Sequence, residues 1–178
     1  MDQDKMIKIY ARSDSRIQLK MIPGHFVTSQ SHITHYLDLT TMKSRCAEAQ
    51  RIAATLATNY EASIPVDTIV CMDGLEVIGA YLAETLSQNG ITSMNQHKSI
   101  YVVTPEVHSS GQLIFRDNLQ PMIEGKHVLL LIASATTGKT IKKSLECIKY
   151  YGGSIAGISA IFSVATEVDG YPVHALFT

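Results

Sequence analysis

The sequence has no tryptophan and only three cysteines among its 178 residues. The cysteines are odd in number and far apart, and they indicate neither a disulfide framework nor a CxxC metal site. No apolar run is long enough to cross a bilayer, and the first residues lack the apolar core of a signal peptide. We therefore expect a protein of the cytoplasm, with reduced cysteines and without a membrane partner.

Neither sign of charge is in excess. Lys and Arg together number 15, Asp and Glu number 16, and the isoelectric point is near 6.6. This balance excludes a large basic surface, so nucleic acid is not an expected partner. Hydrophobic residues make up 46% of the chain, which is typical of a folded globular protein. Because no repeat or linker divides it, we expect a single domain over residues 1–178.

Apolar and amphipathic segments alternate along the chain. Residues 1–23 are expected to form a hairpin of two strands that ends at Pro23-Gly24. Apolar residues spaced by three and four predict one helix from Thr41 to Tyr60, with a buried face made of Met42, Cys46, Ala49, Ala53, Leu56 and Tyr60. Residues 105–125 contain two prolines and two glycines, and we expect a long, mobile loop with a short strand at 112–115.

Further strands are predicted at 67–72, 99–104, 127–133, 155–164 and 173–177, with helices at about 75–87 and from Thr140 to Gly152-Gly153. Alternation of strands and helices implies parallel strands joined by right-handed crossovers. The predicted fold class is therefore α/β, with a mainly parallel sheet flanked by helices. Ligands bind such sheets at the carboxyl ends of the strands. Two of these ends open into glycine-bearing turns, Met72-Asp73-Gly74 and Ser134–Thr140.

The second turn has the chemistry of a phosphate site. It consists of Ser134, Ala135, Thr136, Thr137, Gly138, Lys139 and Thr140. The turn enters a helix, whose first backbone N–H groups lack partners and attract anions. Hydroxyls add donors, the glycine permits close backbone approach, and the lysine supplies a full charge. We expect this loop to bind phosphate; the simpler alternative is an ordinary strand-to-helix turn capped by a threonine.

Two known loops fit these letters. The first is the Walker A loop of nucleotide hydrolases, with Ala133 in place of its first glycine and Gly138-Lys139-Thr140 at its end. Only 38 residues follow Thr140, and the one strong strand among them, 155–164, has no acidic end to hold Mg²⁺. We therefore favour the second loop.

The segment resembles the phosphoribosyl diphosphate (PRPP) loop of type I phosphoribosyltransferases. In that loop an apolar run ends in two acidic residues, two variable ones, Thr-Thr-Gly, and a Ser or Thr two positions on. Here Thr136-Thr137-Gly138 and Thr140 follow the apolar run Val128–Leu131. Upstream, the chain is similar to the orotate phosphoribosyltransferase branch in these segments: Gly24-His-Phe26, Ser29, Tyr36-Leu-Asp38, Val66–Gly74 and Ile123-Glu-Gly125.

The resemblance implies the transfer of a ribose phosphate from PRPP to orotate, giving orotidine monophosphate and diphosphate. It places the 5′-phosphate at Thr136–Thr140, the diphosphate at Met72, Asp73 and Gly74, and the base near Phe26 and Ser29. It also implies a homodimer. No covalently bound cofactor is expected, and Mg²⁺ is expected only if PRPP chemistry is retained.

The sequence departs from the family where PRPP is handled. Ile132 and Ala133 stand in place of the acidic pair, and the cations of the family's mobile loop are missing, with His108 as a remnant. Losing two charged hydrogen bonds of about 1.5–3 kcal/mol each costs on the order of 10²–10⁴ in binding or rate. We therefore expect weak, altered or lost transferase activity and assign no catalytic residue.

Two alternatives to the transferase stay open at this point. One is a non-catalytic regulatory protein on the same scaffold, which binds a nucleotide or a phosphosugar. The other is a Walker-type nucleotide binder. No metal site is predicted, although His32 and His35 have a spacing that would bring two imidazoles together on a helix.

Overall fold

A computed structural model describes residues 6–27, 32–60, 63–88 and 93–178. The helices are α1 (Thr40–Ser44), α2 (Cys46–Ala57), α3 (Glu76–Gln88) and α4 (Lys139–Tyr150), with a 3₁₀ turn η2 (Gln120–Met122). The strands are β1 (Ile7–Tyr10), β2 (Gln18–Val27), β3 (His32–Asp38), β4 (Thr68–Cys71), β5 (Tyr101–Val103), β6 (Glu106–Val107), β7 (Leu113–Ile114), β8 (His127–Ala135), β9 (Ser154–Ser163), β10 (Glu167–Val168) and β11 (Tyr171–Phe177).

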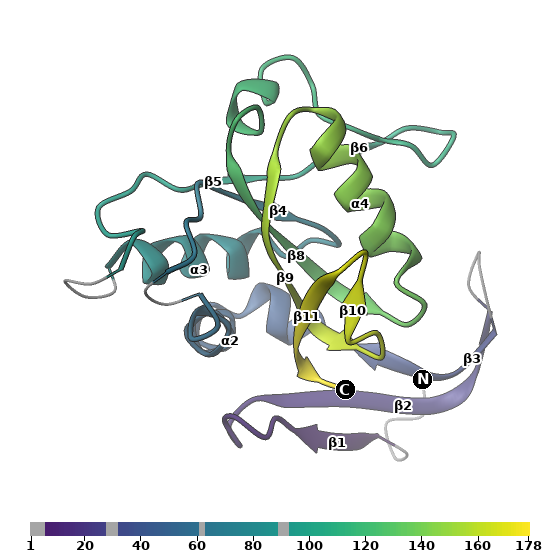
Figure 1. Ribbon diagram of the computed structural model, residues 1–178. Helices are drawn as coiled ribbons and strands as arrows, with labels where there is room; N and C mark the ends of the chain where they lie inside the picture. Colours follow the sequence, from purple (N-terminus) through teal and green to yellow (C-terminus); the bar gives the residue numbers. More distant parts are fainter. Residues whose placement is uncertain (1–5, 28–31, 61–62, 89–92) are drawn as a thin grey trace.

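The centre of the molecule is a six-stranded sheet with the order β10-β11-β9-β8-β4-β5. All neighbouring strands in it run parallel except the short β10, which is antiparallel to β11. Helices α2 and α3 cover one face of this sheet and α4 covers the other (Figure 1). The structure thus confirms the predicted α/β domain with a mainly parallel sheet.

Strand β8 shows why the sheet forms where it does. Its residues from Val128 to Ala133 are all buried, because helices cover both faces of the sheet. Successive side chains of a strand point to opposite faces. Leu129 and Leu131 accordingly join the apolar cluster under α2 and α3, whereas Leu130 and Ile132 join the cluster under α4.

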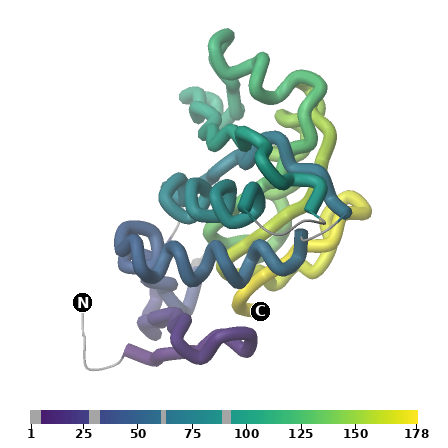
Figure 2. The backbone as a smooth tube through the Cα atoms, turned by 90° about the vertical axis from the view of Figure 1, so that its left-hand side faces the viewer, coloured from purple at the N-terminus to yellow at the C-terminus, as the bar shows by residue number. Residues whose placement is uncertain are grey.

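A second sheet, with the order β1-β2-β3, is antiparallel and packs under α2 (Figure 2). The predicted N-terminal hairpin is present as β1 and β2. The prediction that its second strand ends at Pro23-Gly24 is wrong. Strand β2 runs on to Val27 because its pairing with β3 resumes after an irregularity between Pro23 and Phe26.

The single helix predicted from Thr41 to Tyr60 is also wrong, because the chain breaks at Arg45. That residue has an extended backbone, with φ −93° and ψ 110°, and it separates α1 from α2. The break leaves Cys46 exposed, although the periodic pattern placed it on the buried face. Tyr60 lies beyond the end of α2 but is fully buried, and its hydroxyl lies 2.8 Å from the Ser159 hydroxyl.

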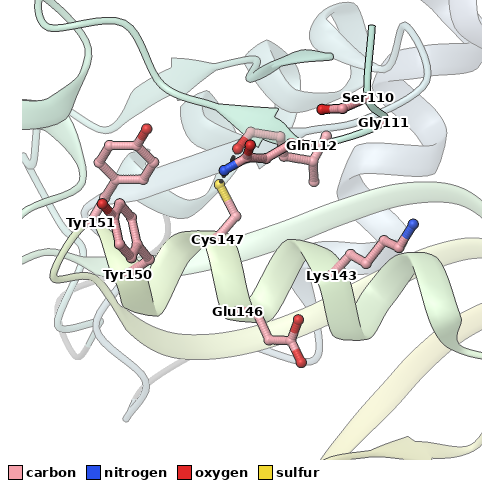
Figure 3. A pocket seen from close by; sticks show the side chains of 9 residues that line it. Ser110, Gly111, Gln112, Lys143, Glu146, Cys147, Tyr150 and Tyr151 are labelled. Carbon is pink, nitrogen blue, oxygen red and sulfur yellow. Dashed lines mark hydrogen bonds between the residues drawn. The ribbon is translucent and has the colours of Figure 1, made fainter. Parts of the chain in front are cut away.

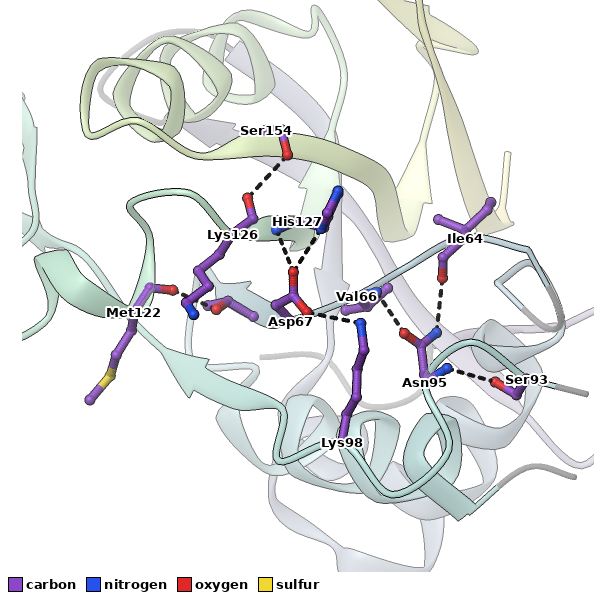
Figure 4. A network of polar contacts seen from close by, with 11 residues as sticks. Ile64, Val66, Asp67, Ser93, Asn95, Lys98, Met122, Lys126, His127 and Ser154 are labelled. Carbon is purple, nitrogen blue, oxygen red and sulfur yellow. Dashed lines mark hydrogen bonds and ion pairs between the residues drawn. The ribbon is translucent and has the colours of Figure 1, made fainter. Parts of the chain in front are cut away.

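The amino-terminal edge of the central sheet is tied together by Asp67 (Figure 4). Its carboxylate accepts hydrogen bonds from the His127 N–H (2.9 Å), the His127 ring (2.7 Å) and Lys98 (2.9 Å). Partial burial opposes ionisation of this group, but these bonds outweigh it and lower the pKa of Asp67 to about 2. The network joins the starts of β4 and β8 to the segment before β5, at the edge opposite the predicted ligand site.

None of the helices in the described part of the chain has the length and apolar character needed to span a membrane.

Candidate functional site

The two glycine-bearing turns lie together at the carboxyl edge of the central sheet. Strands β4 and β8 are neighbours, with Cys71 opposite Leu131. Beyond this last pair, the Ala133 N–H donates to the Asp73 carboxylate at 3.2 Å. The structure therefore brings together the two segments that the sequence assigned to the 5′-phosphate and the diphosphate.

The phosphate loop is shorter than predicted. Ser134 and Ala135 belong to β8 instead, because they pair with Phe162 and Ser163 of β9. Ala135 is buried, and the exposed part of the segment consists of Ser134, Thr136, Thr137, Lys139 and Thr140. Strand β8 extends beyond its apolar run because β9 supplies hydrogen-bond partners for its backbone. The local hydrophobic pattern of the sequence does not show this pairing.

Several hydrogen-bond donors in this loop have no acceptor among the described residues. The first backbone N–H of α4 that finds a carbonyl is that of Lys142, which donates to Gly138 at 2.9 Å. Within the described residues, the N–H groups from Thr137 to Ile141 have no backbone acceptor. The hydroxyls of Ser134, Thr136, Thr137 and Thr140 and the ammonium of Lys139 likewise contact no partner in the described chain. Free N–H groups at a helix start, with a lysine beside them, form a site for an anion.

Gly138 is the N-cap of α4, with φ +72° and without a side-chain cap. The alternative of a threonine-capped turn is therefore wrong. A β-carbon on this glycine would lie 3.0 Å from Val168 Cγ2, so β10 packs tightly against the loop. The fold itself thus requires glycine here, independently of any close approach by a ligand.

The other turn presents one carboxylate. Asp73 and Gly74 both have left-handed backbones, with φ of 57° and 77°, and both are exposed. Met72 is 6% exposed and packs into the core under α4, so its side chain does not line the turn. The turn bends the chain away from β8, so β4 does not continue beside it. The Ala133 N–H, which a longer β4 could have paired, donates to the Asp73 carboxylate instead.

Three polar side chains at this edge of the sheet were not predicted from the sequence. Lys43 of α1 donates a hydrogen bond to the Asp73 carbonyl, which places a cation at the turn. Thr104, just after β5, donates to the Glu76 carboxylate of α3 at 2.8 Å. No local signal could have found these contacts, because they join residues about 30 positions apart and depend on how α1 and β5 lie against β4.

The positions of the missing acidic pair lie inside the core. Ile132 is fully buried under α4, and Ala133 is 3% exposed in the cluster under α2 and α3. A carboxylate at Ile132 would be an uncompensated buried charge, which is costly. Restoring the acids at these positions would therefore damage the fold, and it is not a clean test of activity.

The long segment 105–125 contains secondary structure of its own. Strands β6 and β7 pair as a hairpin, and the predicted short strand is confirmed as β7. His108 lies at the start of the hairpin turn and is exposed. Arg116, the cation nearest to it in the hairpin, is ion-paired with Glu106, so its charge is largely balanced.

Of the two predicted base-pocket residues, the structure describes Phe26 alone, on the N-terminal sheet. Phe26 lies in β2, with its ring centroid 5.7 Å from that of Tyr36 in β3. Ser29 lies outside the described residues, so its predicted role stays a prediction. His35 lies in β3, in a strand and not on a helix. No group of three or more His, Cys, Asp or Glu that could hold a metal occurs in the described ranges.

Solved phosphoribosyltransferases resemble this structure along most of its length. Orotate phosphoribosyltransferase of Mycobacterium tuberculosis, in complex with inorganic phosphate, is 15% identical with a TM-score of 0.58, covering 91% of this chain and 89% of that one. The Aeropyrum pernix orotate enzyme is 16% identical, with a TM-score of 0.56 and coverages of 89% and 87%. Adenine phosphoribosyltransferase of Thermoanaerobacter pseudethanolicus is 16% identical, with a TM-score of 0.57 and coverages of 98% and 96%.

No model of a known family matches the sequence, and no curated protein matches it either. The likeness is thus one of structure and not of sequence. It covers 89–98% of this chain in the three structures named above. The chain therefore has the type I phosphoribosyltransferase fold.

Proposed function

We propose that the protein binds a phosphorylated ribose ligand, PRPP or a nucleoside monophosphate, through its 5′-phosphate at Thr136–Thr140. The observation that carries this proposal is the set of free donors at the start of α4, together with the exposed Lys139. An anion there satisfies N–H groups that otherwise bond only to water. The M. tuberculosis enzyme of the same fold, solved in complex with inorganic phosphate, supports the same ligand chemistry.

Transfer of the ribose phosphate is weak or lost in this proposal. The positions of the acidic pair, Ile132 and Ala133, are in the core, and Arg116 of the hairpin is ion-paired. Stabilisation of a departing diphosphate requires fixed positive charge. Such a protein acts by sensing a nucleotide or a phosphosugar.

One observation favours a second candidate, which is retained transfer to a pyrimidine such as orotate. Asp73 presents an exposed carboxylate beside Ala133, where the family has an acid, although it comes from a different strand. One of its oxygens accepts the Ala133 N–H, and a carboxylate has further lone pairs for ribose hydroxyls. Mg²⁺ is commonly held by one or two carboxylates together with substrate phosphates, so Asp73 suits an ion that arrives with PRPP.

Calorimetry on the full chain tests the binding proposal. The ligands are PRPP, orotidine monophosphate, adenosine monophosphate and inorganic phosphate, each with and without Mg²⁺. We expect a monophosphate to bind without Mg²⁺, and Lys139→Ala to weaken it by about 10- to 100-fold, since a charge-assisted hydrogen bond contributes about 1.5–3 kcal/mol. Lys149→Ala, at the far end of α4, is the matched control. Equal binding to wild type and to Lys139→Ala would refute the site.

Diphosphate release from PRPP separates the two candidates. The structural relatives include orotate and adenine enzymes, so both bases are assayed. Turnover with either base that Asp73→Asn abolishes supports the second candidate and overturns the inactive interpretation. Tight binding of ATP, stronger than that of any monophosphate and dependent on Lys139, would instead support the Walker-type alternative.

A further inference from the structure

A groove of about 440 Å³ lies between α4 and the β6–β7 hairpin (Figure 3). Helix α4 turns Ile141, Leu145 and Ile148 toward the sheet, and the groove lies along its outer side. It is separate from the phosphate loop, which lies at the start of the same helix. Its volume falls within the range of small-molecule pockets.

One end of the groove is aromatic. Tyr150 is 83% exposed, and the only ring that its ring contacts among the described residues is that of Tyr151, at 5.1 Å and nearly perpendicular. Tyr151 in turn packs edge-on against the buried Phe115, at 5.4 Å. A ring held in place while its face stays in water is a ready surface for stacking a planar group.

The other end carries a positive charge. Lys143 is exposed and has no ion-pair partner among the described residues. It lies seven residues from Tyr150 on the helix, which corresponds to about 10 Å. Glu146 also lines the groove, between them along α4, and its carboxylate points away from the hairpin in Figure 3. A planar ring and an anionic group at opposite ends of one ligand fit this arrangement.

The middle of the groove is polar and pre-formed. The Gln112 side chain from the hairpin points over Cys147 and makes no hydrogen bond within the described chain. Its amide has both a hydrogen-bond donor and an acceptor, and such a group can form two hydrogen bonds with the edge of a nucleobase. Below it, the Cys147 thiol donates to the Leu113 carbonyl at 3.4 Å, and burial raises its pKa to about 11. The uncharged thiol therefore forms the base of the groove, and its hydrogen bond links α4 to the hairpin.

We propose that this groove is a second binding site, for a nucleoside monophosphate. The base stacks on Tyr150 and pairs with the Gln112 amide, and the phosphate lies at Lys143. Because the walls come from two elements, the ligand bridges α4 and the hairpin and holds residues 106–114 against the helix. The site is distinct from the proposed phosphate loop and does not depend on it.

The test uses uridine monophosphate and a Thr137→Val/Lys139→Ala variant, which weakens the phosphate loop by removing one hydroxyl and its ammonium group. We expect calorimetry of this variant to show one tighter site per chain, which is the groove. Adding Tyr150→Ala or Lys143→Ala lowers the affinity about tenfold or more, whereas Lys149→Ala leaves it unchanged. Uridine, without a phosphate, binds more weakly and equally well with or without Lys143.

Hydrogen exchange gives a second readout that works in the wild-type protein. Uridine monophosphate slows exchange of the 106–114 amides, and Tyr150→Ala abolishes the effect while the protein stays folded. This result does not depend on whether the loop variant folds. The proposal is overturned if the ligand leaves exchange in 106–114 unchanged, or if a folded loop variant does not bind it or binds it equally well without Tyr150 and Lys143.

Discussion

Replacing Gly138 by alanine measures how far the fold, and not the ligand, requires the glycine of the phosphate loop. The residue has φ +72°, and an added β-carbon would lie 3.0 Å from Val168 Cγ2. A left-handed backbone costs an L-residue about 1–2 kcal/mol. Overpacking adds about 1–3 kcal/mol when the neighbour has to move. We expect the free energy of unfolding to fall by about 2–5 kcal/mol.

Gly170→Ala is the matched control. Gly170 has φ +83°, but a β-carbon there meets nothing within 4 Å, so it reports the backbone cost alone. The difference between the two variants is therefore the contact with Val168. Adding Val168→Ala to Gly138→Ala should recover that contact cost, relative to Val168→Ala alone, and leave the backbone cost in place.

Urea unfolding followed by circular dichroism supplies the free energies, provided that the slope with denaturant stays constant. In a chain of this length each 1 kcal/mol corresponds to about 2–4 °C in the melting temperature. The reasoning is refuted if Gly138→Ala costs no more than Gly170→Ala. Unchanged stability with lost phosphate binding would show that the glycine serves the ligand instead.

Four further predictions concern the rest of the molecule. The Asp67 carboxylate has a pKa of about 2 when folded and about 3.9 when unfolded, so its stabilisation is present above pH 4 and lost as the pH falls toward 2. Urea melts should show a larger loss in the wild type than in Asp67→Asn, which keeps the lowered pKa values of Asp14 and Asp38. A thiol reagent at pH 8 should modify the exposed Cys46 first and Cys147 slowly, because burial raises the pKa of Cys147 to about 11; simultaneous modification of both would contradict this order. Tyr60→Phe should destabilise by about 1–3 kcal/mol, because the buried Ser159 hydroxyl loses its partner, and an unchanged urea midpoint would show that Ser159 finds another. Light scattering should give a mass near twice 19.5 kDa if the homodimer implied by the resemblance forms, and a monomer mass would exclude it.

The sequence by itself determined the fold class and the run of donors from Thr136 to Thr140, which we propose binds phosphate. The apolar run in β8 has no polar position from Val128 to Ala133, and this pattern requires cover on both faces of a sheet. The residues from Thr136 to Thr140 are consecutive, so their hydroxyls and Lys139 come together whatever the rest of the chain does. Both features consist of consecutive residues, so a single sequence is enough to recognise them.

Only the tertiary structure decided the ends of the elements and the second half of the site. Strand β8 extends through Ala135 because β9 pairs with it there. The carboxylate of Asp73 reaches the Ala133 backbone across 60 positions of sequence, and Lys43 reaches Asp73 across 30. Such contacts depend on which strands become neighbours and how α1 lies against them. The packing of the whole core determines this arrangement, so no short segment of the sequence predicts it.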